Sequence, residues 1–130
     1  MSTDRPDVAS FTAEIVCHLD SLVAEDARGF QLGVGEWPLR GIVVRHGCAV
    51  HAYVNRCPHA GHPLNLSPDR FLTEDRQFLV CASHGALFEL ATGRCVAGPC
   101  AGASLTPLRV YVENRQVILD PTVNITDYQQ

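Results

Sequence analysis

Two short stretches of this chain, NRCPHAGHPL (residues 55–64) and LVCASHGALF (residues 79–88), each place a histidine shortly after a cysteine. The first stretch has the pattern C-x-H and the second has the pattern C-x-x-H, with 21 residues between the two patterns. Thiolate and imidazole groups are protein ligands that suit iron and zinc. The two stretches therefore predict one metal centre, and its candidate ligands are Cys57, His59, Cys81 and His84.

Each of these two arms follows a run of residues typical of a β-strand. Residues 49–55 and 78–81 contain β-branched and aromatic side chains, which favour extended backbone. We therefore expect both arms to be loops that face one another at one end of a sheet.

The rest of the chain predicts an all-β fold. Phe30, Leu32 and Val34 alternate with Gln31 and Gly33, the period-two pattern of a half-buried antiparallel strand. The expected fold class is an antiparallel sandwich or open barrel, with the two loops as a separate binding subdomain. The candidate strands are residues 12–17, 29–34, 41–45, 49–55, 78–81, 86–90, 108–113 and 116–120.

Turn residues separate these candidate strands. His46-Gly47, Thr92-Gly93 and Asn114-Arg115 lie between paired runs and predict hairpin turns. Residues 19–27 are the one segment expected to form a helical turn, with Asp20-Ser21 as a possible cap.

The composition is that of one globular domain. The chain has 130 residues, of which 46% are hydrophobic and 18% charged, and this balance argues against disorder. We expect residues 1–130 to form a single domain, folded over roughly 12–120, with short loose tails that include 124–130. The net charge is −4 and the ten basic residues are scattered arginines, so we expect no nucleic-acid partner.

The sequence also bears on location. The first ten residues, MSTDRPDVAS, lack the basic stretch and apolar core of a secretory signal. No apolar run is long enough to span a bilayer. We therefore expect a cytoplasmic protein that has no membrane partner.

The two arms resemble the cluster-binding loops of Rieske 2Fe–2S proteins, and of soluble Rieske-type ferredoxins in particular. Gly61 and Gly85 fit the loops of that family, and Gly98-Pro99 is similar to its third, cluster-covering loop. The resemblance extends over roughly residues 12–120. It implies one 2Fe–2S cluster per chain, in which Cys57 and Cys81 bind one iron while His59 and His84 bind the other.

Mixed ligation has an electrostatic consequence. Two ferric irons, two sulfides and two thiolates sum to zero charge, whereas four thiolates would leave two negative charges. An electron enters a neutral centre more easily, so histidine ligation raises the reduction potential. Reduction in turn raises the pKa of the ligating imidazoles and couples a proton to the electron.

Other interpretations of the cysteines stay open at this point. A Cys₂His₂ set also suits tetrahedral Zn²⁺. Cys17 and Cys48 lie in apolar runs and are expected to be small buried residues. Cys95 and Cys100 are expected to be free thiols in a reducing cytoplasm, although a disulfide or a second metal site is conceivable.

The resemblance implies single-electron transfer and not catalysis by the chain alone. We expect a monomeric Rieske-type ferredoxin that passes electrons from a reductase to an oxygenase or a similar redox enzyme. The alternatives are the small Rieske subunit of a larger reductase, such as nitrite reductase, and a redox sensor. The sequence does not name the donor or the acceptor.

The resemblance also implies where a partner would dock. The family turns its thiolates inward and its histidines outward, so His59 and His84 would form an exposed tip. His62 is a candidate for lining this tip, and the nearby apolar candidates for support or contact are Val54, Pro58, Ala60 and Leu87.

Three departures from the respiratory Rieske proteins predict a low potential. Those proteins carry a serine two residues after the second ligand histidine and a tyrosine four residues after it, and both hydroxyls stabilise the reduced cluster. The matching residues here are Ala86 and Phe88. Those proteins also join the two loops by a disulfide, at positions that are His62 and Ser83 here. We therefore expect a potential on the order of −150 mV, near the low end of the Rieske range.

Overall fold

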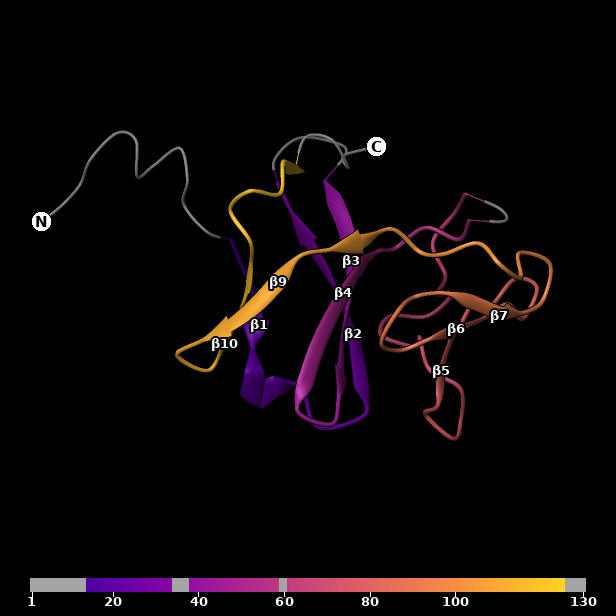
Figure 1. Ribbon diagram of the computed structural model, residues 1–130, viewed down its shortest axis with the longest axis horizontal. Coiled ribbons are helices and arrows are strands. Elements are labelled where there is room, and N and C mark those ends of the chain that lie inside the picture. Colours follow the sequence, from indigo (N-terminus) through magenta and orange to yellow (C-terminus); the bar gives the residue numbers. More distant parts are fainter. Residues whose placement is uncertain (1–13, 34–37, 59–60, 126–130) are drawn as a thin grey trace, which may run out of the picture.

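A computed structural model describes residues 14–33, 38–58 and 61–125 of the chain. This part of the chain folds into three antiparallel sheets and a short 3₁₀ turn, Leu19–Ser21 (Figure 1). The predicted all-β class is confirmed, and the described sheets do not close into a barrel. Within the described residues, no helix is long and apolar enough to cross a membrane.

The four-stranded sheet forms the middle of the molecule. It has the order β2 (Asp26–Leu32), β3 (Leu39–His46), β4 (Ala49–Val54) and β8 (Pro107–Leu108). Strand β3 lies inside this sheet and buries Ile42, Val43 and Val44 on both of its faces. Such a run of buried β-branched residues is typical of a strand covered on both sides.

A three-stranded sheet packs beside it and contains the first and last strands of the described fold. Its order is β1 (Glu14–His18), β10 (Gln116–Leu119) and β9 (Val110–Glu113). Asn114 and Arg115 form the predicted hairpin turn between β9 and β10, with φ values of 53° and 60°. Two consecutive positive φ values are those of a type I′ turn, which matches the twist of the strands.

The third sheet lies at the other end of the molecule, on the right in Figure 1. It consists of β5 (Phe78–Val80), β6 (Leu87–Glu89) and β7 (Cys95–Ala97). Tyr53 of β4 joins this sheet to the central one, because its buried hydroxyl donates a hydrogen bond to the Leu90 carbonyl at 2.7 Å. Burial raises the pKa of Tyr53 to about 12, so the hydroxyl stays protonated.

The core continues from the central sheet into the small one. Phe71, Leu79 and Phe88 are at most 1% exposed and belong to the same buried cluster as Ile42 and Val44. Full burial of one such side chain stabilises the fold by about 1.5–3 kcal/mol. The same cluster includes four cysteines: Cys57, Cys81, Cys95 and Cys100.

Several element predictions were wrong in detail. Residues 108–113 are not one strand, because Pro107–Leu108 pairs with β4 whereas Val110–Glu113 pairs with β10. In the sequence Leu108, Val110 and Val112 alternate with Arg109, Tyr111 and Glu113, a pattern typical of one half-buried strand, but Val112 is 44% exposed. Strand β7 was not predicted, and Val34 lies outside the described residues. The observed bounds of the other strands differ from the predicted ones by up to three residues.

The helical turn expected within residues 19–27 is present as the 3₁₀ turn Leu19–Ser21, and it is shorter than that range. The 3₁₀ turn ends at Ser21, whose hydroxyl donates to the His18 carbonyl, and β2 already begins at Asp26. Cys48 is exposed in the β3–β4 turn and is not a buried residue. Ile125, expected in a loose tail, packs on a core cluster with Val123.

Candidate metal centre

The two cysteine arms fold into the same kind of closed loop. In each arm the cysteine N–H donates to a carbonyl five residues later, and the cysteine carbonyl accepts from the glycine four residues later. Gly61 and Gly85 have φ values of 77° and 74°, which only glycine adopts without strain. The pairs, donor first, are Cys57–His62 at 2.8 Å, Gly61–Cys57 at 2.7 Å, Cys81–Ala86 at 2.9 Å and Gly85–Cys81 at 2.9 Å.

Hydrogen bonds tie the two arms to each other. The Ala82 N–H donates to the Leu64 carbonyl at 2.8 Å. His62 Nδ1 lies 2.9 Å from the Pro63 carbonyl, which can only accept, so Nδ1 carries a proton. In the neutral ring Nε2 is then an acceptor, and the Ser83 hydroxyl donates to it at 3.1 Å. A hydrogen bond therefore joins the two positions at which respiratory Rieske proteins would carry a disulfide.

The sequence predicted that both arms would lie at the end of one sheet, and this prediction was wrong because the two arms follow strands of different sheets. The first follows β4 of the central sheet and the second follows β5 of the small sheet. Asn55 anchors the first arm, because its Oδ1 accepts from the Leu64 N–H at 2.8 Å and its N–H donates to the Arg40 carbonyl at 2.9 Å. Our sequence reasoning missed this residue, although asparagine at a strand end is a frequent turn former.

The two candidate ligand thiols lie together in the interior. Cys57 and Cys81 are each 1% exposed. Burial raises the pKa of the Cys81 thiol and the neighbouring Cys57 raises it further, whereas backbone N–H groups of Ser83 and His84 lower it. A metal cation would replace the thiol protons and offset the cost of burying two sulfur donors side by side, so this pair fits an iron centre.

The two candidate histidine ligands lie in the exposed part of the second arm and in the first arm. His84 is exposed, whereas His59 lies outside the described residues. The described residues contain no group of three or more cysteines, histidines or carboxylates that could hold a metal ion. Cys57 and Cys81 are buried and His84 is exposed, and the assignment of these residues and His59 as ligands stays a prediction.

A third loop covers the second arm. Gly98 has a φ of 98°, and a Cβ at this position would lie 2.8 Å from the Ala86 Cα, so only glycine permits this close packing. Cys100 follows in the same loop, and burial together with the neighbouring Cys95 and Cys57 thiols raises its pKa to about 12. Both Cys95 and Cys100 are free thiols, as expected.

The other residues singled out from the sequence have different environments. Ala86 is 1% exposed and Phe88 is 0% exposed. Neither side chain has a hydroxyl group that could donate a hydrogen bond to the site. Pro58 is exposed and Leu87 is half-buried, and both are available near the arms. Val54 is 8% exposed and belongs to a buried core cluster with Leu39 and Leu108, whereas Ala60 lies outside the described residues.

A pocket of about 440 Å³ lies next to the first arm, between β2, β3 and residues 63–71. Its ionisable lining residues are Arg40 and Asp69. The Asp69 carboxylate accepts a hydrogen bond from the Gly29 N–H at 2.9 Å and is already engaged in holding the loop. The pocket therefore offers less distinctive chemistry than the two thiol arms.

Comparison with known proteins agrees with this geometry. The family model of the Rieske [2Fe-2S] domain matches residues 13–117. The chain therefore belongs to the Rieske [2Fe-2S] domain family, and its cofactor is one 2Fe–2S cluster. No curated protein matches the chain.

Solved structures include similar ferredoxins and oxygenases. The ferredoxin of carbazole 1,9a-dioxygenase from Nocardioides aromaticivorans IC177 is 25% identical with a TM-score of 0.66, and the match covers 85% of this chain and 99% of that one. A chain in the complex of reduced oxygenase and oxidized ferredoxin in carbazole 1,9a-dioxygenase is 23% identical with a TM-score of 0.65, over 86% and 95%. The terminal oxygenase from Novosphingobium sp. KA1 is 19% identical with a TM-score of 0.67, over 87% and 34%.

Proposed function

We propose that this protein is a Rieske-type ferredoxin that passes single electrons from a reductase to an oxygenase or a similar redox enzyme. The observation that carries the proposal is the pair of matching loops that bring Cys57 and Cys81 together in the interior. The family assignment supports it, as does the nearly complete match to chains of ferredoxin length. In this proposal the chain is a monomeric, cytoplasmic carrier and not an enzyme by itself.

The proposed ligands keep the roles expected from the sequence. Cys57 and Cys81 would bind one iron as thiolates, and His59 and His84 would bind the other as imidazoles. When bound, the 2Fe–2S cluster supplies a centre that accepts and returns one electron.

The residues of the chain adapt this site to electron transfer. Burial of both thiols excludes water from the sulfur side of the site. The N–H groups of Ser83 and His84 point positive dipoles at the Cys81 sulfur, which favours added negative charge. Exposure of His84 leaves a short route from the site to a partner surface. Docking at this tip through a small, transient interface suits a carrier that must release its partner after each transfer.

Iron content and spectroscopy of ligand variants test this proposal. The natively purified protein should be red-brown, with about two irons and two sulfides per chain and a low average g value after reduction. Cys57→Ser, Cys81→Ser, His59→Ala and His84→Ala should each lose the cluster or change its spectrum. The matched controls Cys48→Ser and Cys95→Ser, which alter cysteines outside the ligand set, should keep both. A colourless protein with stoichiometric zinc would contradict the proposal.

A further inference from the structure

Two cysteines outside the proposed ligand set lie within reach of each other. The Cys100 thiol donates to the Cys95 sulfur at 3.1 Å, and the Cys95 thiol donates to the Ala97 carbonyl at 3.2 Å. A disulfide bond is about 2.05 Å long, so the two sulfurs need to approach by only about 1 Å to form one.

The backbone of the third loop holds this pair in place. The Cys95 N–H donates to the Ala103 carbonyl at 2.8 Å, and the Cys95 carbonyl accepts from the Gly102 N–H at 3.0 Å. The Ala103 N–H donates to the Cys100 carbonyl at 2.9 Å, which closes the turn. Because these bonds fix both Cα positions, the chain is organised for a bond between the sulfurs before any oxidation.

We propose that Cys95 and Cys100 form a reversible disulfide, a modification site separate from the cluster ligands, by exchange with small disulfides of the glutathione class. Cys100 would attack the small disulfide, forming a mixed disulfide and releasing one glutathione thiol. Cys95 would then attack the Cys100 sulfur and release the second. The two protons of the protein thiols end on the two released thiols, so one disulfide is reduced while one is formed.

Exposure decides the order of these steps. Cys100 is 9% exposed and its neighbours Pro99 and Ala101 are exposed, whereas Cys95 is 1% exposed. Cys100 is therefore the entry point, and Cys95 is the resolving thiol beneath it. Because both sulfurs are nearly buried and the pKa of Cys100 is raised, little thiolate forms near neutral pH, and we expect exchange to be much slower than at the exposed Cys48 and faster at higher pH.

The pair also adjoins the proposed cluster site. Cys100 neighbours Cys57, the first candidate ligand. An S–H group beside a ligand sulfur favours the reduced, more negative state, and disulfide formation removes that proton. Oxidation of the pair should therefore shift the midpoint potential to a more negative value.

Peptide mass spectrometry of the cluster-loaded protein tests the modification itself. Cleavage after Arg94 and Arg109 leaves both cysteines in one peptide, 95–109. After incubation with oxidised glutathione, this peptide should lose two hydrogen atoms and resist alkylation, and a dithiol reductant should restore it. Cys48 is the internal control and should carry a mixed disulfide. If peptide 95–109 stays fully alkylated after prolonged incubation at mildly alkaline pH, long after Cys48 is fully modified, the proposal is wrong.

Single variants separate this pair from the rest of the molecule. Cys95→Ser should trap glutathione on Cys100, whereas Cys100→Ser should leave peptide 95–109 unmodified. Modification of Cys95 in the Cys100→Ser variant would overturn the assigned order. Voltammetry before and after oxidation should show the negative shift in wild type and none in Cys100→Ser. An unchanged wild-type potential would refute the link to the cluster site. The peptide result does not depend on electron transfer, so it stands or falls separately from the proposed function.

Discussion

Ala86 shows how a single residue can set the properties of the site. It is 1% exposed, its carbonyl accepts the hydrogen bond that closes the second arm, and it packs against Gly98 of the third loop. Its methyl group cannot donate a hydrogen bond, and neither can Phe88 two residues later. The low potential expected from the sequence therefore has a local cause: neither Ala86 nor Phe88 can donate a hydrogen bond that would stabilise the reduced cluster.

The change Ala86→Ser should raise the midpoint potential by tens of millivolts, because a hydroxyl would stabilise the reduced centre. Protein-film voltammetry near neutral pH measures this shift. The control is Ala82→Ser, which adds the same hydroxyl at an exposed position of the same arm. Equal potentials for wild type and Ala86→Ser, with the cluster intact, would mean that the hydroxyl does not reach a sulfur.

Glu25 gives a second prediction at this scale. Hydrogen bonds from His46 and from the Gly47 N–H lower the pKa of the Glu25 carboxyl. A carboxyl with a lowered pKa stabilises the folded state above its ordinary pKa, and this contribution is lost as pH falls through the lowered value. Wild type should therefore lose more stability than Glu25→Gln between pH 6 and pH 3 (about the range in which carboxylates titrate). Urea unfolding at several pH values measures the difference, and parallel curves would contradict it.

At the scale of elements, the small sheet is held to the central sheet by Tyr53. The ring of Tyr53 packs over Gly93, where a Cβ would lie 2.7 Å from the ring, and its hydroxyl reaches the carbonyl of Leu90. The contact therefore joins β4 to the β6–β7 turn. It places an aromatic side chain of the central sheet at the base of the subdomain that carries the second arm.

The change Tyr53→Phe should lower the free energy of unfolding by about 1–3 kcal/mol, because the Leu90 carbonyl would stay buried without its donor. Chemical denaturation followed by circular dichroism measures this loss. Tyr111→Phe is the matched control, because Tyr111 is 38% exposed and the change should be nearly neutral. A Tyr53→Phe protein as stable as wild type would show that this bond does not stabilise the junction.

The elements also show what sequence patterns can and cannot predict. The hairpin at Asn114-Arg115 follows from local turn chemistry, and it was correctly predicted. The split of residues 107–113 between two sheets does not follow from alternation, because the pattern continues across Arg109 while the pairing partner changes. The pairing of the arms was equally hidden, since the bond from Ala82 to Leu64 depends on how two different sheets pack.

For the candidate site, the sequence predicted which residues take part better than it predicted how they are arranged. The spacing of cysteines and histidines identified both arms and the family. It carried no information on Asn55, which anchors the first arm, or on the contact between His62 and Ser83. These depend on tertiary packing between segments about 10 to 20 residues apart, which local pattern does not encode.

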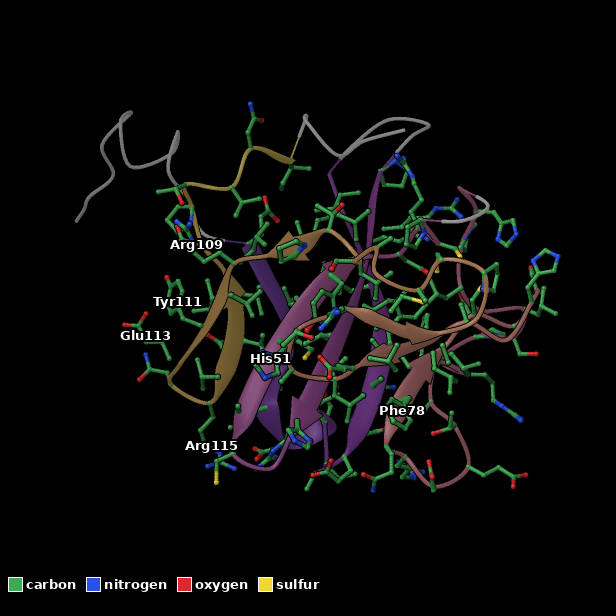
Figure 2. All side chains as sticks on the ribbon, turned by 45° about the vertical axis from the view of Figure 1, so that its right-hand side comes forward. His51, Phe78, Arg109, Tyr111, Glu113 and Arg115 are labelled. Atoms are coloured by element: carbon green, nitrogen blue, oxygen red, sulfur yellow. The ribbon has the colours of Figure 1, made fainter. Side chains whose placement is uncertain are left out.

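Across the whole molecule, the small sheet, followed by the second arm with His84, and the β9–β10 hairpin lie at opposite ends. Figure 2 shows Tyr111 and Glu113 on the hairpin side, away from the small sheet that carries Phe78. The small sheet and the two arms form the other end in Figure 1 as well. The two ends therefore offer a test of where a partner binds.

Substitutions at the tip should slow electron transfer, whereas substitutions on the hairpin should not. Pro58→Glu, at an exposed site beside the first arm, should lower the rate of reduction of a co-purifying oxygenase by about tenfold, as one misplaced rim charge can. Stopped-flow absorbance measures this rate. Tyr111→Glu places the same charge on the hairpin and should leave the rate unchanged. A slower rate in Tyr111→Glu alone would place the docking surface elsewhere.

The chain leaves the central sheet after Val54 and returns to it at Thr106, and the N–H of the first donates to the carbonyl of the second at 2.8 Å. Everything that defines the site, both arms and the covering loop, lies between these two adjacent points. Residues 55–106 thus form one continuous insertion, which begins and ends at two adjacent points of the central sheet. Loop lengths and the surroundings of the ligands can change within such an insertion, while β4 and β8 on either side of it stay as they are. We therefore expect substitutions within residues 55–106 to change the redox properties of the site without changing the strands on either side.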